Sequence, residues 1–126
     1  MSPQADQTIF VVDDDAAMRD SLRWLLESAG LQVETHPNGE AFLESFEPDR
    51  SGCVLLDVRM PGMGGFAVAR ELQKRHIPIP VIILTAYADS QTAKQAREVG
   101  ALAFLKKPFD DQVLLDAVGR ALDATD

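Results

Sequence analysis

The chain has 126 residues and a mass of 13.8 kDa, the size of one ordinary domain that folds without disulfide or metal staples. Hydrophobic residues make up 46% and charged residues 25%, a balance typical of globular rather than disordered proteins. The net charge of −8 argues against a domain that coats a nucleic-acid backbone or an anionic membrane. Cys53 is the single cysteine, no signal-peptide pattern opens the chain, and the apolar runs are short, so we expect a cytoplasmic protein.

Short apolar runs alternate with stretches of helical period along the chain. Runs of this length, rich in Val and Ile, are typical of parallel strands that helices bury on both faces. They lie at residues 9–12, 31–33, 53–56, 81–84 and 101–105. The alternation predicts an α/β fold, a doubly wound parallel sheet of five strands with five helices.

The helical stretches differ in the apolar surface that they offer to the sheet. We expect helices at about residues 18–30, 40–46, 66–76, 90–99 and 110–122. The fourth has only Ala93, Ala96 and Val99 on its apolar face, so it should be the least firmly packed. Val113 should be buried by the fifth helix, and Trp24, between apolar positions of the first, should be half-buried.

Polar residues follow the predicted strands at their carboxyl ends, where open α/β sheets bind ligands. Asp13 and Asp14 follow the first strand, Asp57 the third, Thr85 the fourth, and Lys106 and Lys107 the fifth. Three carboxylates close together repel one another, and a divalent cation would relieve that repulsion. Oxygen ligation by carboxylates and waters suits Mg²⁺, with Mn²⁺ as a second candidate. Asp15, in contrast, suits the N-cap of the first helix.

In these strand-end motifs the sequence resembles the receiver domain of bacterial two-component response regulators. The motifs are VVDDD at residues 11–15, LDVRMPGMGG at 56–65, LTA at 84–86 and FLKKPF at 104–109. None is decisive alone, but their order makes the resemblance strong, and it covers residues 9–122. It implies a flavodoxin-like strand order of 2-1-3-4-5. Phe109 and the motifs together resemble receivers of transcription factors of the nitrogen-fixation regulator type.

The resemblance assigns chemical roles to the acidic residues. Asp57 would accept a phosphoryl group from a sensor histidine kinase, forming an acyl phosphate. Asp13 and Asp14 would hold Mg²⁺, with Asp57 and the backbone carbonyl of Arg59 as further ligands. The implied function is a phosphorylation-dependent signalling switch and not an enzyme, with only self-phosphorylation and self-dephosphorylation chemistry.

Three further residues would respond to the phosphoryl group. Lys107 would pair with its oxygens and Thr85 would donate a hydroxyl, while the ring of Phe104 would follow Thr85. Strand alternation, independently of the resemblance, separates the two lysines by face and assigns the chemistry to Lys107, leaving Lys106 solvated or facing a partner. The resemblance also implies a cis peptide bond at Lys107-Pro108.

The sequence departs from the family pattern at Gly64, where a residue with a capping side chain is usual. With Gly62 and Gly65 nearby, we expect a loosely held loop, and Gly64→Asp should raise thermal stability. Arg59 and Tyr87 occupy positions where the family tunes the lifetime of the phosphate. The large ring of Tyr87 is expected to shield the acyl phosphate from water.

An alternative interpretation is an enzyme, a phosphatase of the haloacid dehalogenase type. Asp13 would then be the nucleophile and Asp15 the general acid. Ala16-Ala17 stands where that family has a Gly/Thr or similar pair, and the chain is short for that fold. A second alternative is a degenerate receiver that only binds partners, although every acceptor-site residue is present.

We expect residues 1–126 to form a single receiver domain with its core at about residues 8–122. Residues 123–126 would begin a linker to an output domain that lies outside this chain and controls transcription. Phosphorylation would favour a homodimer through the fourth helix, fifth strand and fifth helix. The domain itself is expected to contact neither nucleic acid nor membrane.

Overall fold

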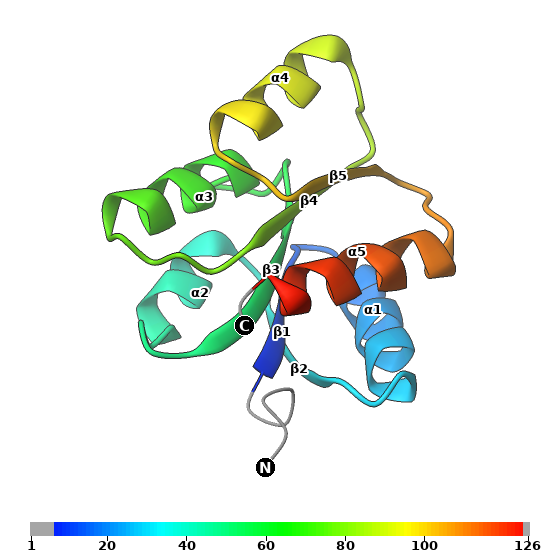
Figure 1. The fold of residues 1–126 in the computed structure, drawn as a ribbon. Coiled ribbons are helices and arrows are strands. Elements are labelled where there is room, and N and C mark those ends of the chain that lie inside the picture. Colours follow the sequence, from blue (N-terminus) through cyan, green and yellow to red (C-terminus); the bar gives the residue numbers. More distant parts are fainter. Residues whose placement is uncertain (1–6, 125–126) are drawn as a thin grey trace.

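The apolar runs of the sequence form the strands of one parallel sheet. In the computed structural model, which describes residues 7–124, they are β1 (Gln7–Val12), β2 (Gln32–His36), β3 (Ser51–Asp57), β4 (Val81–Thr85) and β5 (Ala103–Lys106) (Figure 1). Neighbouring strands are parallel throughout, in the order β2-β1-β3-β4-β5. The doubly wound α/β fold and its strand order are therefore confirmed.

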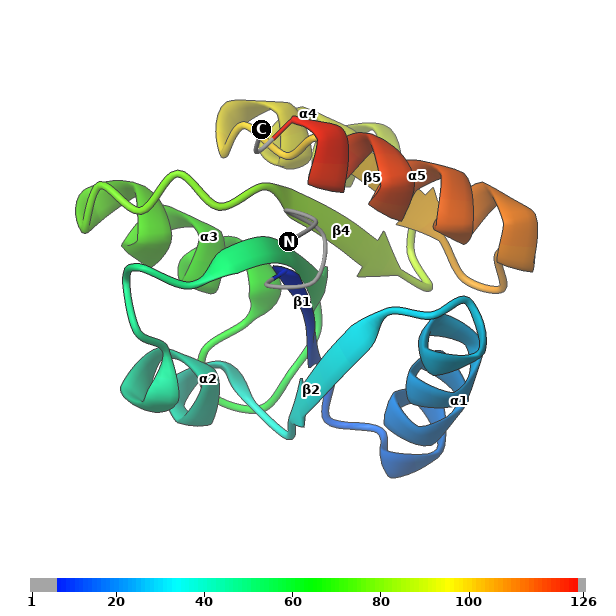
Figure 2. The same cartoon turned by 60° about the horizontal axis from the view of Figure 1, so that its bottom comes forward.

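Five helices within residues 7–124 connect the strands and cover both faces of the sheet. They are α1 (Ala16–Ser28), α2 (Gly39–Ser45), α3 (Gly65–Lys74), α4 (Ser90–Glu98) and α5 (Asp111–Asp123). One face carries α1 and α5, and the other carries α2, α3 and α4 (Figures 1 and 2). No helix in this part of the chain is long and apolar enough to cross a membrane. Residues 1–6 and 125–126, which include the end of the expected linker, lie outside the described residues.

Alternating strand residues give each face of the sheet a core of its own. Ile9 and Val11 pack with the apolar residues of α1 and α5, whereas Phe10 packs with those of α2 and α3. On the second face, Phe10, Phe42 and Phe46 form an aromatic cluster with ring centroids 5.6, 5.3 and 5.2 Å apart. These two cores fix the central strands, and with them the carboxyl edge of the sheet.

The helices differ widely in how much of their surface is buried. α5 buries five side chains, whereas Ala96 is the buried residue among those described in α4. The expectation that the fourth helix is the least firmly packed is confirmed. Two expectations of burial are wrong, because Trp24 is 71% exposed and Val113 is 48% exposed. Trp24 lies two residues from the buried Leu22 and Leu26, and Val113 directly precedes the buried Leu114. A turn of about 100° per residue carries both exposed side chains off the apolar faces of their helices.

Side chains cap most of the helix N-termini. Asp15 accepts hydrogen bonds from the backbone N–H groups of Ala17 and Met18, as predicted. Asn38, Asp89 and Asp110 cap α2, α4 and α5 in the same way. The first turns of these helices thus have partners for backbone donors that would otherwise lack them.

The start of α3 depends instead on a close approach between backbones. Gly64 offers no side-chain cap, and a Cβ there would lie 2.7 Å from the carbonyl oxygen of Val58. A Cβ on the buried Gly65 would overlap the carbonyl oxygen of Asp57. These glycines permit tight packing of the loop against the end of β3, rather than looseness. The approach to the Val58 carbonyl argues against the expected stabilisation by Gly64→Asp, and we now expect this substitution to lower stability.

Candidate functional site

Two buried carboxylates lie side by side at the carboxyl edge of the sheet. The register of β1 and β3 pairs Val12 with Leu56, so the next residues, Asp13 and Asp57, emerge together. Asp13 is 1% exposed and Asp57 is 8% exposed. Asp14 lies beside them on the surface, and one carboxylate oxygen from each of the three residues lies within 4.8 Å of the others. The structure therefore brings together the three acidic residues that were predicted to converge.

One lysine reaches this acidic cluster from the end of β5. Lys107 Nζ lies 2.8 Å from Oδ2 of Asp13 and 3.6 Å from Oδ1 of Asp57. The backbone N–H of Lys107 donates to the carbonyl of Thr85 at 2.7 Å, which fixes this segment beside the end of β4. Lys106 is exposed, and the peptide bond between Lys107 and Pro108 is cis, as expected. A single ammonium among three carboxylates leaves the cluster with excess negative charge.

The electrostatics of Asp57 reflect that excess. Burial raises the pKa of its carboxyl, and the neighbouring charge of Asp13 raises the pKa further. The ammonium of Lys107 and a hydrogen bond from the backbone of Arg59 lower the pKa without cancelling the increase. A cation among these oxygens would relieve the repulsion. Because the donors are all oxygens and Asp14 opens the cluster to solvent, the residues fit a hard divalent cation such as Mg²⁺.

Backbone contacts hold Asp13 in this position. Its Oδ1 accepts the backbone N–H of Asp15 at 2.9 Å, and its own N–H donates to the carbonyl of His36 at 3.2 Å. Nη1 of Arg19 donates to the carbonyl of Asp13 at 2.7 Å. The side chain of Asp15 is exposed and occupied with capping α1. Asp15 is therefore a structural acid and lies outside the carboxylate cluster.

Comparison with protein families shows which family this fold belongs to. Residues 9–119 match the model of the response regulator receiver domain. The chain belongs to this family. The alternative interpretation as a haloacid dehalogenase phosphatase is therefore wrong, in keeping with the capping role of Asp15.

Two curated relatives of this receiver domain are named transcriptional regulatory proteins. It is 47% identical over 115 residues to the transcriptional regulatory protein TdiR of Thauera aromatica, covering 91% of this chain and 51% of TdiR. It is 44% identical over 114 residues to FixJ of Azorhizobium caulinodans, covering 90% of this chain and 54% of FixJ. The chain thus spans about half the length of these relatives. The crystal structure of FixJ-N matches with a TM-score of 0.87 at 40% identity, over 94% of each chain. The resemblance to the nitrogen-fixation regulator type is confirmed.

The end of β4 supplies the receiver with a buried hydroxyl. Thr85 is 1% exposed, and its Oγ1 accepts the backbone N–H of Tyr87 at 2.9 Å. The same hydroxyl contacts the carbonyl of Tyr87 at 3.4 Å, a long distance for an O–H donor. β3 and β4 are neighbours with Asp57 paired to Leu84, so the loops that follow them also lie together.

A contact between these two loops was missed by sequence reasoning. The guanidinium carbon of Arg59 lies 3.8 Å from the centroid of the Tyr87 ring, a cation–π stack. The charge of Arg59 also helps to lower the pKa of Asp89, after the larger effect of hydrogen bonds from Thr92. Two signals in the sequence pointed to this contact. Arg59 and Tyr87 each stand two residues after the end of a strand, and the two strands, β3 and β4, are neighbours. Side-chain direction, however, could not be read from spacing.

Phe104 lies one strand away from Thr85, on the face covered by α3 and α4. It is half-buried, packs against the apolar core of that face and is paired with Ile83 of β4. The ring is thus neither fully enclosed nor free in solvent. Its surroundings leave it adjacent to α4, the helix with the least buried surface.

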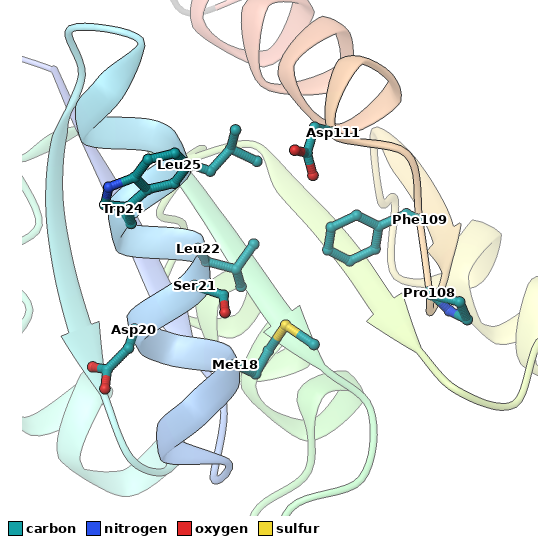
Figure 3. A pocket seen from close by; sticks show the side chains of 9 residues that line it. All are labelled: Met18, Asp20, Ser21, Leu22, Trp24, Leu25, Pro108, Phe109 and Asp111. Atoms are coloured by element: carbon teal, nitrogen blue, oxygen red, sulfur yellow. The ribbon is translucent and has the colours of Figure 1, made fainter.

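An apolar groove adjoins the site on the α1 side. Met18, Leu22 and Leu25 of α1 face Phe109 across it, and Pro108, the residue after Lys107, also lines it (Figure 3). Trp24 lies at the edge of the groove. Sequence reasoning missed this groove because it is formed by one helix face and a distant loop.

Proposed function

We propose that this receiver domain is a phosphorylation-dependent switch in which Asp57 accepts a phosphoryl group from a sensor histidine kinase. The observation that carries the proposal is a buried carboxylate with a raised pKa, set among Asp13, Asp14 and the ammonium of Lys107. Buried acids arranged with one lysine at the carboxyl edge of an α/β sheet are typical of functional sites. Membership of the receiver family supports signalling rather than turnover of a substrate.

The acceptor step is a nucleophilic displacement at phosphorus. A carboxylate oxygen of Asp57 forms the new P–O bond, while the P–N bond to the donor's imidazole breaks and that imidazole regains a proton. Asp13, Asp14, Asp57 and the backbone carbonyl of Arg59 are the residues that would hold Mg²⁺. Bound there, Mg²⁺, or Mn²⁺ in its place, would supply positive charge to the phosphoryl oxygens. Water later cleaves the acyl phosphate, so the chemistry is limited to self-phosphorylation and self-dephosphorylation.

The switch follows from the change in charge at Asp57. A phosphoryl group replaces one carboxylate charge by about −1.5 to −2 and adds strong acceptor oxygens. The ammonium of Lys107, already 3.6 Å from Asp57, pairs with them, and the hydroxyl of Thr85 turns toward them. Phe104 then fills the space that Thr85 leaves, which alters the face formed by α4, β5 and α5. Arg59 and Tyr87 tune how long the phosphate lasts.

The output of the switch is control of transcription by a part of the protein outside this chain. The chain spans about half the length of the regulators TdiR and FixJ, and both are named transcriptional regulatory proteins. We therefore assign residues 1–126 to one receiver domain. Because α5 extends to Asp123, the proposed linker would follow this helix and not begin at residue 123. The partners are a histidine kinase in the cytoplasm and a second copy bound through α4, β5 and α5. Nucleic acid and membrane are not partners of this domain.

The test is the intact mass after incubation with acetyl phosphate and Mg²⁺. We expect one phosphoryl adduct on the wild type, lost with Asp57→Asn or a chelator. Asp13→Asn should keep the acceptor but lower the yield. An adduct that survives Asp57→Asn and disappears with Asp13→Asn would move the nucleophile to β1. No adduct from acetyl phosphate or from a phosphorylated histidine kinase would leave a degenerate receiver that only binds partners.

A further inference from the structure

The stack of Arg59 on Tyr87 joins the two loops that leave the site. The guanidinium lies 3.8 Å from the ring centroid, and Tyr87 is 54% exposed, so the contact sits at the surface above the buried Thr85. The backbone of Arg59 is hydrogen-bonded to the carboxylate of Asp57. The stack therefore connects the acceptor residue with the loop that carries Thr85 into α4.

The hydroxyl of Thr85 is tied to the same tyrosine through the backbone. Its oxygen accepts the N–H of Tyr87 at 2.9 Å and lies 3.4 Å from the Tyr87 carbonyl oxygen, the long end of the range for an O–H donor. A hydroxyl has one proton to donate, so it cannot serve that carbonyl and a phosphoryl oxygen together. Moving Thr85 toward Asp57 must break its bond with the Tyr87 N–H or pull the backbone of Tyr87 along.

Little else holds this segment in place. Tyr87 lies in the described segment 86–90, whose residues are all exposed, and α4 beyond it buries Ala96 as its one described buried residue. Asp89 caps α4 and lies within electrostatic range of Arg59. The guanidinium thus contacts or attracts two residues of the loop. Resting geometry here depends on polar and cation–π contacts more than on burial.

We propose that Arg59 and Tyr87 are positioning residues that hold Thr85 in its resting place and so oppose activation. This inference rests on the proposed function of Asp57 but adds to it, because it concerns the balance between resting and active states rather than phosphate lifetime. The stack favours the resting arrangement, and an active-state ligand must overcome it. An exposed cation–π contact corresponds to about a two- to fivefold change in an equilibrium constant.

The probe is beryllofluoride, which occupies the position of a phosphoryl group on an aspartate and is not hydrolysed away. Its affinity in the presence of Mg²⁺ is measured by fluorine NMR for the wild type and variants. Tyr87→Leu should tighten binding about two- to fivefold by removing the ring, whereas Tyr87→Phe keeps a ring for the guanidinium and should restore wild-type affinity. If the tyrosine only supported the fold, Tyr87→Leu would not tighten beryllofluoride binding, and there would be no gain in affinity for Tyr87→Phe to reverse.

A double-mutant cycle with Arg59→Gln isolates the stack from the general effect of removing a positive charge. In the double variant, the effects of Arg59→Gln and Tyr87→Leu should not add, because either change removes the same contact. Additive effects, or weaker binding by Tyr87→Leu, would overturn the proposal while leaving the acceptor role intact. Binding that is absent in the wild type, or unchanged in Asp57→Asn, would overturn the proposed function itself and the inference with it.

Discussion

The two helices that flank β5 are attached to the sheet in different ways. α5 buries Leu114, Ala117, Val118, Ala121 and Leu122, whereas Ala96 is the buried residue described within α4. A fully buried Leu or Val contributes about 1.5–3 kcal/mol of transfer free energy, and an alanine contributes far less. α5 is therefore anchored by core residues along its length, whereas α4 is anchored by Ala96 and by its buried C-cap residue Val99, so a shift of α4 costs less free energy.

Contacts at its two ends compensate for the small buried surface of α4. Asp89 caps its start by accepting from the backbone N–H and the hydroxyl of Thr92 at 2.8 and 2.7 Å. At its end, Nε2 of Gln73 donates to the carbonyl of Val99 at 2.8 Å. Polar contacts of this kind can be exchanged for others without opening the core. The difference between the two helices indicates that the site at Asp57 acts on α4, the helix whose end contacts can be replaced.

Truncation of a buried side chain should show the largest difference in free energy of unfolding between α5 and α4. Leu114→Ala removes a side chain that is 0% exposed and should lower the free energy of unfolding by about 2–5 kcal/mol. The matched change in α4, Ala96→Gly, should cost about 1 kcal/mol through helix propensity. Urea unfolding followed by circular dichroism measures both. Equal losses would break the comparison.

The loop before α5 is fixed by an ion pair as well as by the core. Lys107→Met leaves the buried Asp13 without its partner at 2.8 Å and should cost about 1.5–3 kcal/mol without metal. Added Mg²⁺ should recover part of that loss, since it supplies positive charge to the same carboxylates. Lys106→Met, at an exposed position, is the control and should change little. Similar losses for both lysines in urea unfolding would contradict the account.

α3 offers a third way to hold a helix start, and Gly64 tests it. A Cβ at this position meets the Val58 carbonyl at 2.7 Å, so Gly64→Ala should destabilise by about 1–3 kcal/mol. Gly64→Asp adds a capping carboxylate worth about 1 kcal/mol and should fall between alanine and wild type. A melting temperature for Gly64→Asp above that of the wild type would show that the loop relaxes freely.

The smallest effect should come from the helix caps, and it should differ between α4 and α5. Asp89→Ala should increase amide exchange throughout α4, whereas Asp110→Ala should affect only the first turn of α5 because its core contacts remain. Hydrogen bonds from Thr92 lower the pKa of Asp89. The stabilisation by this cap is therefore complete above the ordinary carboxyl pKa and is lost as pH falls through the lowered pKa. The measured quantity is the protection factor, which corrects the observed exchange for the slowing of intrinsic amide exchange in acid. Protection factors in α4 that do not fall on acidification would argue against the cap.

Patterns with a fixed period predicted most of the fold. Alternation of apolar runs gave the parallel strands, and the sparse apolar face of residues 90–98 gave the weakly packed α4. Strand-end positions also brought Asp13, Asp14 and Asp57 together, because parallel strands end at the same edge. The strands, the helices and the meeting of the three aspartates depend on the path of the backbone, which the hydrophobic pattern predicts.

Features that depend on side-chain direction or on close contact could not be predicted. Trp24 and Val113 neighbour buried positions in sequence but lie off the buried faces of their helices. The stack of Arg59 on Tyr87 needs two loops to meet, and the packing at Gly64 depends on where the Val58 carbonyl points. In each case, a rotation or an approach of a few ångströms in three dimensions decides the outcome.

Hydrogen–deuterium exchange with and without beryllofluoride and Mg²⁺ tests the central claim most directly. In a sample dilute enough to stay monomeric, so that the proposed dimer does not protect α5, the account predicts that exchange changes mainly in the segment from Thr85 through α4, with little change in α5 beyond its first turn. Asp57→Asn should abolish the change. A response of similar size throughout α5, or one that persists in Asp57→Asn, would contradict the claim that the site acts on the less anchored helix.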